Sequence, residues 1–532
     1  MENNHLPNYL EYRGKYKGLL GWLTTTDHKR IGLMYMYAMM TFFLAGAVIG
    51  LLMRLELIAP GKQLVEAQTY NAFFTLHGLT MIFLFVIPGV GAVFGNFALP
   101  IMLGAKDVSF PRLNLFSWYL YILGAIIVLT SQFMGDGPPD TGWTFYAPYS
   151  LKTQTNVVAA VLGAFVLGFS SILTGLNFIT TMHRLRAPGM GWRRMPIFAW
   201  TLYATGWIQL LATPIIGITL SMIAAERLLG IGFFDPAIGG DPVLYQHLFW
   251  IYSHPAVYIM ILPAMGVISE IIPTFSRKPL FGYDALIISS MAIAFVGYFV
   301  WGHHMFTSGM ATSSRWIFSF LTFLVALPSA VKVFNWTATL YKGSIHLKTP
   351  FWWAMGFIFV FMIGGFSGLV VGSVATDIHV HDTYFVVGHF HYIVFGGTGF
   401  AFFAAMHYWW PKIFGKIYNQ RIANIGLLIF FIGFNILYFP MFVVGLLGMP
   451  RRYYDYLPQF TSENVISTVG SWIMITGLII ILVNLFRSKK ATGKEVDNPW
   501  NGPTLEWTTQ SPPIVENFEE IPVVTHGPYE FK

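Results

Sequence analysis

The chain has 532 residues, of which 55% are hydrophobic and only 10% are charged, and its mean hydropathy is +0.59. This composition excludes an ordinary soluble globular protein and is typical of a chain that crosses a membrane many times. The net charge of +7 does not indicate nucleic acid, because the basic residues are not clustered on one soluble module. The absence of cysteine excludes disulfides, iron-sulfur clusters and thiolate metal sites.

Apolar segments long enough to cross a bilayer recur along the whole chain. They are expected to be helical, because an open sheet edge would leave its backbone polar groups unpaired in lipid. The fold class predicted is therefore all-α, a polytopic membrane protein with a bundle of twelve transmembrane helices. The predicted spans are 31–53, 72–100, 114–134, 155–182, 197–225, 243–272, 284–305, 315–341, 351–374, 384–410, 422–447 and 465–486.

The basic residues predict the orientation of the bundle. Lys and Arg are frequent in every second connecting segment, counted from the N-terminus, and sparse in the others, which places both termini in the cytoplasm. Residues 1–30 lack the pattern of a cleaved signal peptide, so we expect the first span to act as its own signal. The predicted organisation is a cytoplasmic segment 1–30, a membrane domain 31–487 and a cytoplasmic tail 488–532.

Histidines from four predicted helices gather at one depth of the membrane. Ionisable residues within spans are rare and are usually functional. In the predicted topology, all six lie in the outer half of the bundle, an arrangement that scattered packing residues would not produce. They are His77, His254, His303, His304, His389 and His391.

His389 and His391 cannot bind the same metal ion. They are two residues apart, so they point about 200° away from each other around a helix of 3.6 residues per turn. They need two different centres, and His77 could supply a second axial ligand to one of them. Histidine-ligated haems fit that demand.

A second group lies on the sixth and seventh spans. His254 and Tyr258 are four residues apart and share a helical face, which places a phenol beside a possible metal ligand. The adjacent His303 and His304 could both turn toward His254. Three neutral imidazoles without a carboxylate suit copper or zinc.

An ordered set of short motifs resembles subunit I of the haem-copper terminal oxidases, specifically of cytochrome c oxidases. The resemblance covers nearly the whole chain. Its motifs are Asp27-His-Lys-Arg-Ile-Gly32, Gly95-Asn96, Phe110-Pro-Arg112, Gly142-Trp-Thr144, Phe234-Asp-Pro236, Tyr245-Gln-His-Leu-Phe-Trp250, Trp301-Gly-His-His-Met305, Gly448-Met-Pro-Arg-Arg-Tyr453 and Leu505-Glu-Trp507.

The resemblance implies a role for each of these histidines. His77 and His391 would be the axial ligands of a low-spin haem, and His389 the single ligand of a high-spin haem. His254, His303 and His304 would hold the copper ion called CuB. Tyr258 would be covalently joined to His254 and would supply an electron and a proton when the O–O bond breaks.

The resemblance also implies residues around these centres. Arg54 would contact a formyl group of the low-spin haem, which favours haem A. The haem propionates would lie near Trp143, Asp377, Arg451 and Arg452. His381 and Asp382 would bind magnesium, and Glu56 would belong to a sodium or calcium site. For these peripheral residues, an ordinary salt bridge or helix cap is the alternative interpretation.

Two proton pathways are implied from the cytoplasmic side. One would use Lys332 with Ser329 and Ser269 and would end at Tyr258, although a lysine snorkelling to the surface is an alternative. The other would begin at Asp107 and continue through Asn96, Asn114 and Asn177.

The second pathway departs from the common family pattern. Many members carry a glutamate two residues after the copper-ligating histidine, and this chain has Ala256 there. The preceding Tyr252 and Ser253 resemble a subgroup in which hydroxyl groups are thought to replace the acid. Tyr252 is one helical turn from Ala256, so its hydroxyl could reach the same space. The alternative is that Tyr252 only packs.

The function implied is the reduction of O2 to water with electrons from cytochrome c, coupled to proton uptake and pumping. The partners implied are subunit III and a subunit II with a dinuclear copper centre, since this chain lacks the thiolates to build one; membership of a respiratory supercomplex is left open. The membrane expected is the bacterial inner membrane rather than that of mitochondria. The alternatives are a quinol oxidase, a nitric-oxide reductase and a metal-binding transporter. Quinol oxidases carry a His and a Gln shortly before the low-spin haem ligand, and this chain has Thr69 and Ala72 there instead.

Overall fold

The computed structural model describes residues 7–11, 15–135, 137–490 and 496–531. Parts of the two predicted terminal segments, 1–6, 12–14, 491–495 and 532, lie outside the described residues. Within the described residues the secondary structure is helical, apart from two isolated β-bridges, Asn8 with Ile514 and Thr383 with Pro450. The all-α fold class is therefore confirmed.

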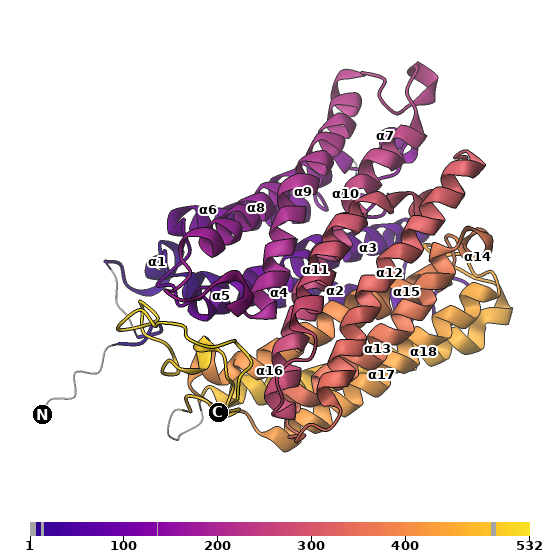
Figure 1. Cartoon of the computed structure of the whole chain (residues 1–532). Helices are drawn as coiled ribbons and strands as arrows, with labels where there is room; N and C mark the ends of the chain where they lie inside the picture. Colours follow the sequence, from indigo (N-terminus) through magenta and orange to yellow (C-terminus); the bar gives the residue numbers. More distant parts are fainter. Residues whose placement is uncertain (1–6, 12–14, 136, 491–495, 532) are drawn as a thin grey trace, which may run out of the picture.

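Twelve helical segments in the described part of the chain are long and apolar enough to cross a membrane, as predicted (Figure 1). Eight are single helices and a further one, Pro458–Ser488, is the short η8 (Pro458–Phe460) followed by α18 (Thr461–Ser488). The eight are α2 (His28–Glu56), α6 (Pro111–Thr130), α8 (Val157–Arg184), α9 (Ile197–Leu229), α10 (Pro242–Ser276), α12 (Thr312–Leu340), α13 (Thr349–Gly372) and α17 (Gln420–Leu446).

The remaining three spans are interrupted by other helical geometries. Two contain π-helical turns, which are rare and are frequent at functional sites. The first is α3 (Ala67–Leu79), η1 (Thr80–Val86), α4 (Ile87–Val90), η2 (Gly91–Gly95) and α5 (Asn96–Met102), with η1 and η2 π-helical. The second is α15 (Tyr384–Phe390), the π-helical η7 (His391–Gly399) and α16 (Phe400–Phe414). The third is α11 (Tyr283–Val296) followed by the 3₁₀ turns η5 (Gly297–Phe299) and η6 (Trp301–Met305).

Short helices lie outside the spans. They are α1 (Gly18–Leu23), α7 (Tyr149–Lys152), η3 (Trp192–Arg194), η4 (Pro236–Ile238), α14 (Val374–Val380) and η9 (Leu505–Trp507). We call the end of the bundle at which α1 and the tail 496–531 lie the terminal end, and the end with α7 and α14 the distal end (Figure 1).

Capping residues explain where the predicted boundaries moved. The first span begins at His28 rather than at 31, because the Asp27 carboxylate accepts hydrogen bonds from the N–H groups of Lys29 and Arg30. The fifth extends to Leu229 and ends at Gly230, which has a left-handed backbone (φ +68°). The predicted span 284–305 leaves α-helical geometry at Val296, so His303 and His304 lie on a 3₁₀ turn.

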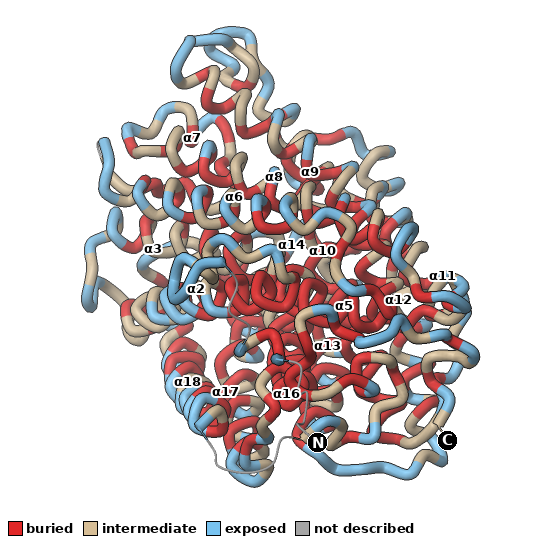
Figure 2. Tube along the Cα trace, turned by 90° about the vertical axis from the view of Figure 1, so that its left-hand side faces the viewer, coloured by how far each residue is buried: buried red, intermediate tan, exposed pale blue. Residues whose placement is uncertain are grey.

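Burial separates the central helices from the outer ones (Figure 2). In their most apolar windows, 89% of the residues of Pro242–Ser276 and 83% of those of Ala67–Met102 are buried, against 17% for Thr312–Leu340. The helices that carry His254 and His77 are thus in the interior, where a polar side chain needs a partner or a ligand.

Candidate functional site

Three imidazoles from two elements converge in the distal half of the bundle. His254 of α10 and His303 and His304 of η6 each offer a ring nitrogen, and these nitrogens all lie within 4.8 Å of one another. His254 Nδ1 is 3.1 Å from His304 Nε2. His254 Nε2 is buried and has no hydrogen-bond partner among the described residues. The arrangement can hold a metal ion that accepts nitrogen ligands.

Neighbouring side chains fix the orientation of these rings. Trp250 stacks on His304 with ring centroids 3.8 Å apart, and His303 Nδ1 lies 2.9 Å from the Thr322 hydroxyl. The Tyr258 ring is 4.7 Å from that of His254. The structure thus brings together the pair for which a covalent link is predicted.

His389 and His391 lie on opposite sides of their helix. His389 Nδ1 faces α13, 3.1 Å from the carbonyl oxygen of Gly364 and 3.0 Å from the Ser367 hydroxyl. His391 stacks instead on Tyr438 of α17, with ring centroids 4.4 Å apart. The electrostatic neighbours differ in the same way, since His389 interacts with His303 and His391 with His77.

The three histidines predicted to bind haem share one hydrogen-bonding arrangement. The Nδ1 atoms of His77, His389 and His391 lie 2.9, 3.1 and 2.8 Å from backbone carbonyl oxygens, respectively. A carbonyl only accepts, so each Nδ1 carries the proton and each Nε2 keeps its lone pair. Metal-ligating histidines usually donate their second ring N–H in this way.

Arg54 is a buried cation that has unused donors. Its Nη2 donates to the carbonyl and side-chain oxygens of Asn464 at 2.8 and 3.0 Å. Its Nε and Nη1 are buried and have no partner within the described residues. Since buried N–H groups are rarely left unpaired, the site fits a ligand with an acceptor oxygen.

The two arginines predicted to lie near the propionates differ in their surroundings. Arg451 pairs with Asp382, with Nη2 2.5 Å from Oδ1. Burial would raise the pKa of Asp382, but Arg451, His381 and Arg452 together outweigh it and the pKa is lowered. Arg452 has no carboxylate partner within the described residues, and burial followed by repulsion from Arg451 lowers its pKa to about 10. Arg452 is therefore the cation that gains most from an anionic ligand.

The predicted magnesium ligands have different partners in the structure. His381 Nδ1 lies 2.9 Å from Asp377 Oδ2, whereas Asp382 pairs with Arg451. Burial raises the pKa of Asp377, and the bond from His381 opposes that rise. Trp143 packs against Trp250, with ring centroids 6.0 Å apart, and so links the His77 helix to the imidazole cluster.

Glu56 closes a loop at the distal end. Its carboxylate accepts hydrogen bonds from the N–H groups of Gln63, Leu64 and Val65 at 3.0, 2.6 and 2.9 Å. These bonds tie the end of α2 to the loop that leads into α3.

Lys332 has a partner that the sequence did not predict. Its fully buried ammonium donates to the Ser290 hydroxyl of α11 at 2.6 Å. Of the two predicted neighbours, Ser329 bonds weakly to the Val325 carbonyl at 3.4 Å, and Ser269 accepts from Trp336 at 2.9 Å.

The residues of the second predicted pathway line the terminal half of the bundle. Asp107 is half-buried on the loop before α6, and burial followed by repulsion from Asp27 raises its pKa to about 7. Both amide atoms of Asn114 and the Asn96 Oδ1 are buried without a partner. Asn177 differs, since it exchanges two bonds with the Phe110 backbone. The unpaired amides fit ordered water.

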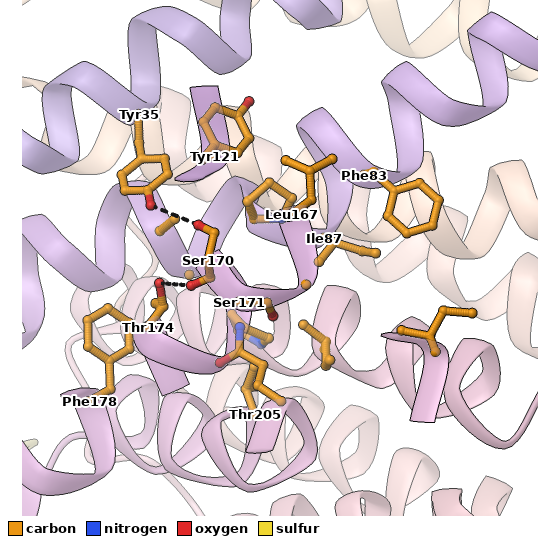
Figure 3. A pocket seen from close by; sticks show the side chains of 18 of the residues that line it. Tyr35, Phe83, Ile87, Tyr121, Leu167, Ser170, Ser171, Thr174, Phe178 and Thr205 are labelled. Carbon is orange, nitrogen blue, oxygen red and sulfur yellow. Dashed lines mark hydrogen bonds between the residues drawn. The ribbon is translucent and has the colours of Figure 1, made fainter. Parts of the chain in front are cut away.

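A cavity lies between the helices within the bundle (Figure 3). Hydroxyl groups of Tyr35, Ser170, Ser171 and Thr174 lie along it, and Tyr252 of α10 forms part of its wall. The volume that the centres of water molecules can occupy is about 40 Å³. By that measure one water molecule needs about 10–15 Å³. The cavity therefore has room for a short chain of water molecules. Ser253 Oγ, beside Tyr252, is buried without a partner.

Comparisons with known proteins agree with this arrangement. The sequence profile of the family described as "Cytochrome C and Quinol oxidase polypeptide I" matches residues 30–473. The cytochrome c oxidase subunit 1 of Synechocystis sp. is 46% identical over 506 residues, covering 95% of this chain and 91% of that protein. The chain belongs to this oxidase family.

A second relative and a solved structure add to this. The cytochrome c oxidase subunit 1 of Bacillus subtilis is 42% identical, covering 97% of this chain and 83% of that protein. The solved structure of a haem-copper terminal oxidase dimer superposes with a TM-score of 0.75 at 20% identity, covering 89% of this chain and 86% of that one, and supports the fold.

Membership of the oxidase family decides between the classes weighed from the sequence. A polytopic transporter is not favoured, because the matching profile and the relatives are oxidase subunits over nearly the whole chain. With twelve apolar helices and bacterial relatives, the chain is a multi-pass protein of a bacterial membrane.

Sequence reasoning missed several polar residues of this oxidase subunit. Ser290, Ser367 and Thr322 contact a predicted site residue, and Tyr35, Ser170 and Thr174 line the cavity. Serines and threonines are common in apolar helices, where they also bond to the carbonyl one turn before, so no sequence pattern separates these residues from the others.

Proposed function

We propose that this chain is the catalytic subunit of a respiratory oxidase that reduces O2 to water with electrons from cytochrome c. The observation that carries the proposal is the convergence of the triad His254, His303 and His304 with His389 on one side of α15, while His391 faces α17 and His77. One helix thereby serves two different centres. The relatives from Synechocystis and Bacillus subtilis carry the name cytochrome c oxidase, which favours cytochrome c over quinol as the donor.

The imidazole triad would hold CuB. The unpartnered Nε2 of His254 and the three neutral nitrogen donors suit copper. Tyr258 lies beside His254 on the same helical face, with ring centroids 4.7 Å apart, so the two rings could be joined. Forming that bond would remove one hydrogen from each ring, and O2, the substrate, would take up the two electrons and two protons. The tyrosine would then donate one electron and its phenolic proton when the O–O bond breaks.

The exposed lone pairs on Nε2 would hold the haems. His389 would ligate the high-spin haem, and His77 with His391 the low-spin haem. When bound, the haems and copper supply the redox chemistry that delivers four electrons to O2. The protein's part is to keep each imidazole in the correct tautomer through its carbonyl bond and to exclude bulk water from the interior.

Arg54 favours haem A. Its unpartnered Nε and Nη1 would donate to the formyl oxygen that distinguishes this haem. Arg452, enclosed and short of anions, would pair with a propionate, and Trp143 and Asp377 would complete that region with Arg451. His381 and Asp382 would bind magnesium after exchanging their present partners, and Glu56 would serve a sodium or calcium ion.

Protons would come from the terminal end, which we place in the cytoplasm. Lys332 would deliver protons to Tyr258, together with Ser290 beside it, Ser329 one turn earlier on α12 and Ser269 on α10. Asp107 would collect protons for the second pathway through Asn96, Asn114 and Asn177 and the hydroxyl-lined cavity. Tyr252 and Ser253 would pass them on in place of the missing glutamate, since a hydroxyl can donate and accept at once.

The partners follow from what this chain lacks. Without thiolates it cannot build a dinuclear copper centre, so a subunit II would receive the electrons from cytochrome c. A subunit III and association into a respiratory supercomplex are consistent with the exposed apolar surfaces of the outer helices.

The proposal is tested by reduced-minus-oxidised visible spectra and oxygen consumption of the purified complex. We expect the bands of two haems, and oxygen uptake with reduced cytochrome c but not with a quinol. Two haems with oxygen uptake driven only by a quinol would show that the electron donor is a quinol rather than cytochrome c. The absence of haem bands would reject the function.

A further inference from the structure

The motif at the start of α2 has no part in the proposed reaction, yet it is buried. Lys29 has a side chain with no exposed surface, paired with Asp27 at 3.2 Å. Its ammonium also donates to the Val515 carbonyl and to Asn517 Oδ1, both at 2.8 Å. A buried ammonium needs such partners, and two of the three belong to the C-terminal tail.

Asn517 connects three separate segments at the terminal end. Its amide nitrogen Nδ2 lies 2.8 Å from the carbonyl oxygen of Ala105, 3.1 Å from that of Lys106 and 2.9 Å from His28 Nε2. His28 Nδ1 is 2.6 Å from the Asn96 carbonyl oxygen, so it carries the ring proton and Nε2 accepts. The amide therefore has a single satisfactory orientation, with its oxygen on Lys29.

The carbonyls that Asn517 holds come directly before Asp107. Asn517 is 2% exposed and its backbone is left-handed (φ +66°), a conformation that asparagine adopts more readily than most residues. A second polar link from the tail to this loop is the salt bridge between Lys106 and Glu516, whose side chains are 50% and 64% exposed. An exposed pair contributes little, so the buried amide is the stronger of these two polar links from the tail. The two ends of the loop are held by the helices and the α8–α9 connection: the Leu103 carbonyl accepts from the Ala187 N–H, and the Ser109 N–H donates to Thr181.

We propose that Asn517 is a positioning residue for proton uptake, which fixes the backbone at Ala105 and Lys106 so that Asp107 stays half-buried at the mouth of the second pathway. The C-terminal tail is then a structural part of the uptake site. This inference rests on the proposed role of Asp107. The residue acts through backbone carbonyls and does not itself carry the proton.

The charges and the burial around Asp107 determine how its pKa would change if the loop loosened. Asp27 raises its pKa and Lys29 lowers it, and burial is the largest influence. Lys106, next in sequence, pairs with Glu516. If the loop loosened and water reached the carboxyl, its pKa would fall toward the ordinary value, because the burial effect would shrink. Asp107 would then lose its proton at a lower pH.

The test compares Asn517→Gly with Asn501→Gly in the intact complex. Both asparagines lie in the tail with a left-handed backbone, which glycine accepts, but Asn501 is exposed. We expect Asn517→Gly to slow oxygen consumption about fivefold, the effect of one net hydrogen bond. The alkaline limb of its pH profile should move to lower pH, and hydrogen exchange of residues 103–110 should accelerate. Asn501→Gly should match the wild type in all three.

Two further variants separate positioning from general damage. Asn517→Asp keeps the acceptor for Lys29 and loses the donors to the loop, so it should behave like Asn517→Gly. In an Asp107→Asn background, which should itself slow turnover, Asn517→Gly should add no further loss. An unchanged pH profile in Asn517→Gly, or a full additional loss in the Asp107→Asn background, would overturn the role of Asn517 and leave the proposed pathway standing. Wild-type turnover in Asp107→Asn would overturn the proposed pathway and the inference with it.

Discussion

Trp250 lies face to face with His304, with ring centroids 3.8 Å apart and the two planes 11° apart. The indole covers one side of an imidazole that belongs to the metal-binding triad. Its N–H donates to the Tyr146 hydroxyl at 2.5 Å, so the indole is itself held in place. One member of the triad is therefore oriented by packing, whereas His303 is oriented by a hydrogen bond from or to Thr322.

Replacing Trp250 by Ala should weaken copper binding. Loss of an aromatic contact of this kind removes about 1 kcal/mol, so we expect roughly fivefold weaker copper retention. The measurement is copper per complex after dialysis against a graded chelator, with the haem spectra as control. Trp250→Phe, which keeps a ring, should retain most of the copper, and equal loss in both variants would contradict the stacking argument.

Lys332→Met should block the proton pathway to Tyr258 while it leaves every metal ligand in place. Met fills a similar volume but carries no proton, and steady-state turnover should fall roughly a hundredfold, the scale of a lost proton-transfer group. Ser290→Ala should show a smaller loss, because the ammonium keeps its position but lacks its closest partner. Oxygen consumption near wild type in Lys332→Met would remove this residue from the mechanism.

Tyr252→Phe tests the replacement of the glutamate. The variant keeps the ring that lines the cavity and deletes only the hydroxyl, so slower turnover and impaired proton ejection are expected with unchanged haem spectra. Proton ejection and oxygen consumption are measured together in reconstituted vesicles. If both equalled the wild-type values, Tyr252 would only pack and water alone would supply the path.

The docking of the tail should depend on pH through Glu506. Burial raises its pKa to about 7, and Oε2 has no partner within the described residues. A carboxyl with a raised folded-state pKa favours the docked tail below its ordinary pKa, and that contribution is lost as pH rises through about 7. Hydrogen exchange around residues 504–509 should therefore be faster at pH 8 than at pH 6. In Glu506→Gln the two rates should agree after correction for intrinsic exchange, and a persistent difference would assign the effect to another group.

Much of the fold could be predicted because hydropathy and charge act locally. Each span is a long, predominantly apolar segment, so its existence follows from composition. The opposed directions of His389 and His391 likewise follow from helix periodicity alone. The convergence of His254 with His303 and His304 could be expected only because all lie at one depth.

The rest depends on contacts between segments far apart in the chain. Ser290 meets Lys332 because α11 packs beside α12, and no pattern within either segment records that pairing. The same holds for Asn517, whose partner His28 is 489 residues away. Asp382, which the sequence predicts as a magnesium ligand, forms an ion pair with Arg451, and that pairing too joins segments far apart in the chain.

The most direct measurement is the pair of reduced-minus-oxidised spectra of wild-type and His389→Ala complexes. Because His389 faces α13 and the triad while His391 faces Tyr438, the variant should lose the high-spin haem and keep the low-spin haem held by His77 and His391. Equal loss of both haem signals from a folded variant would contradict the assignment of the two histidines to separate centres.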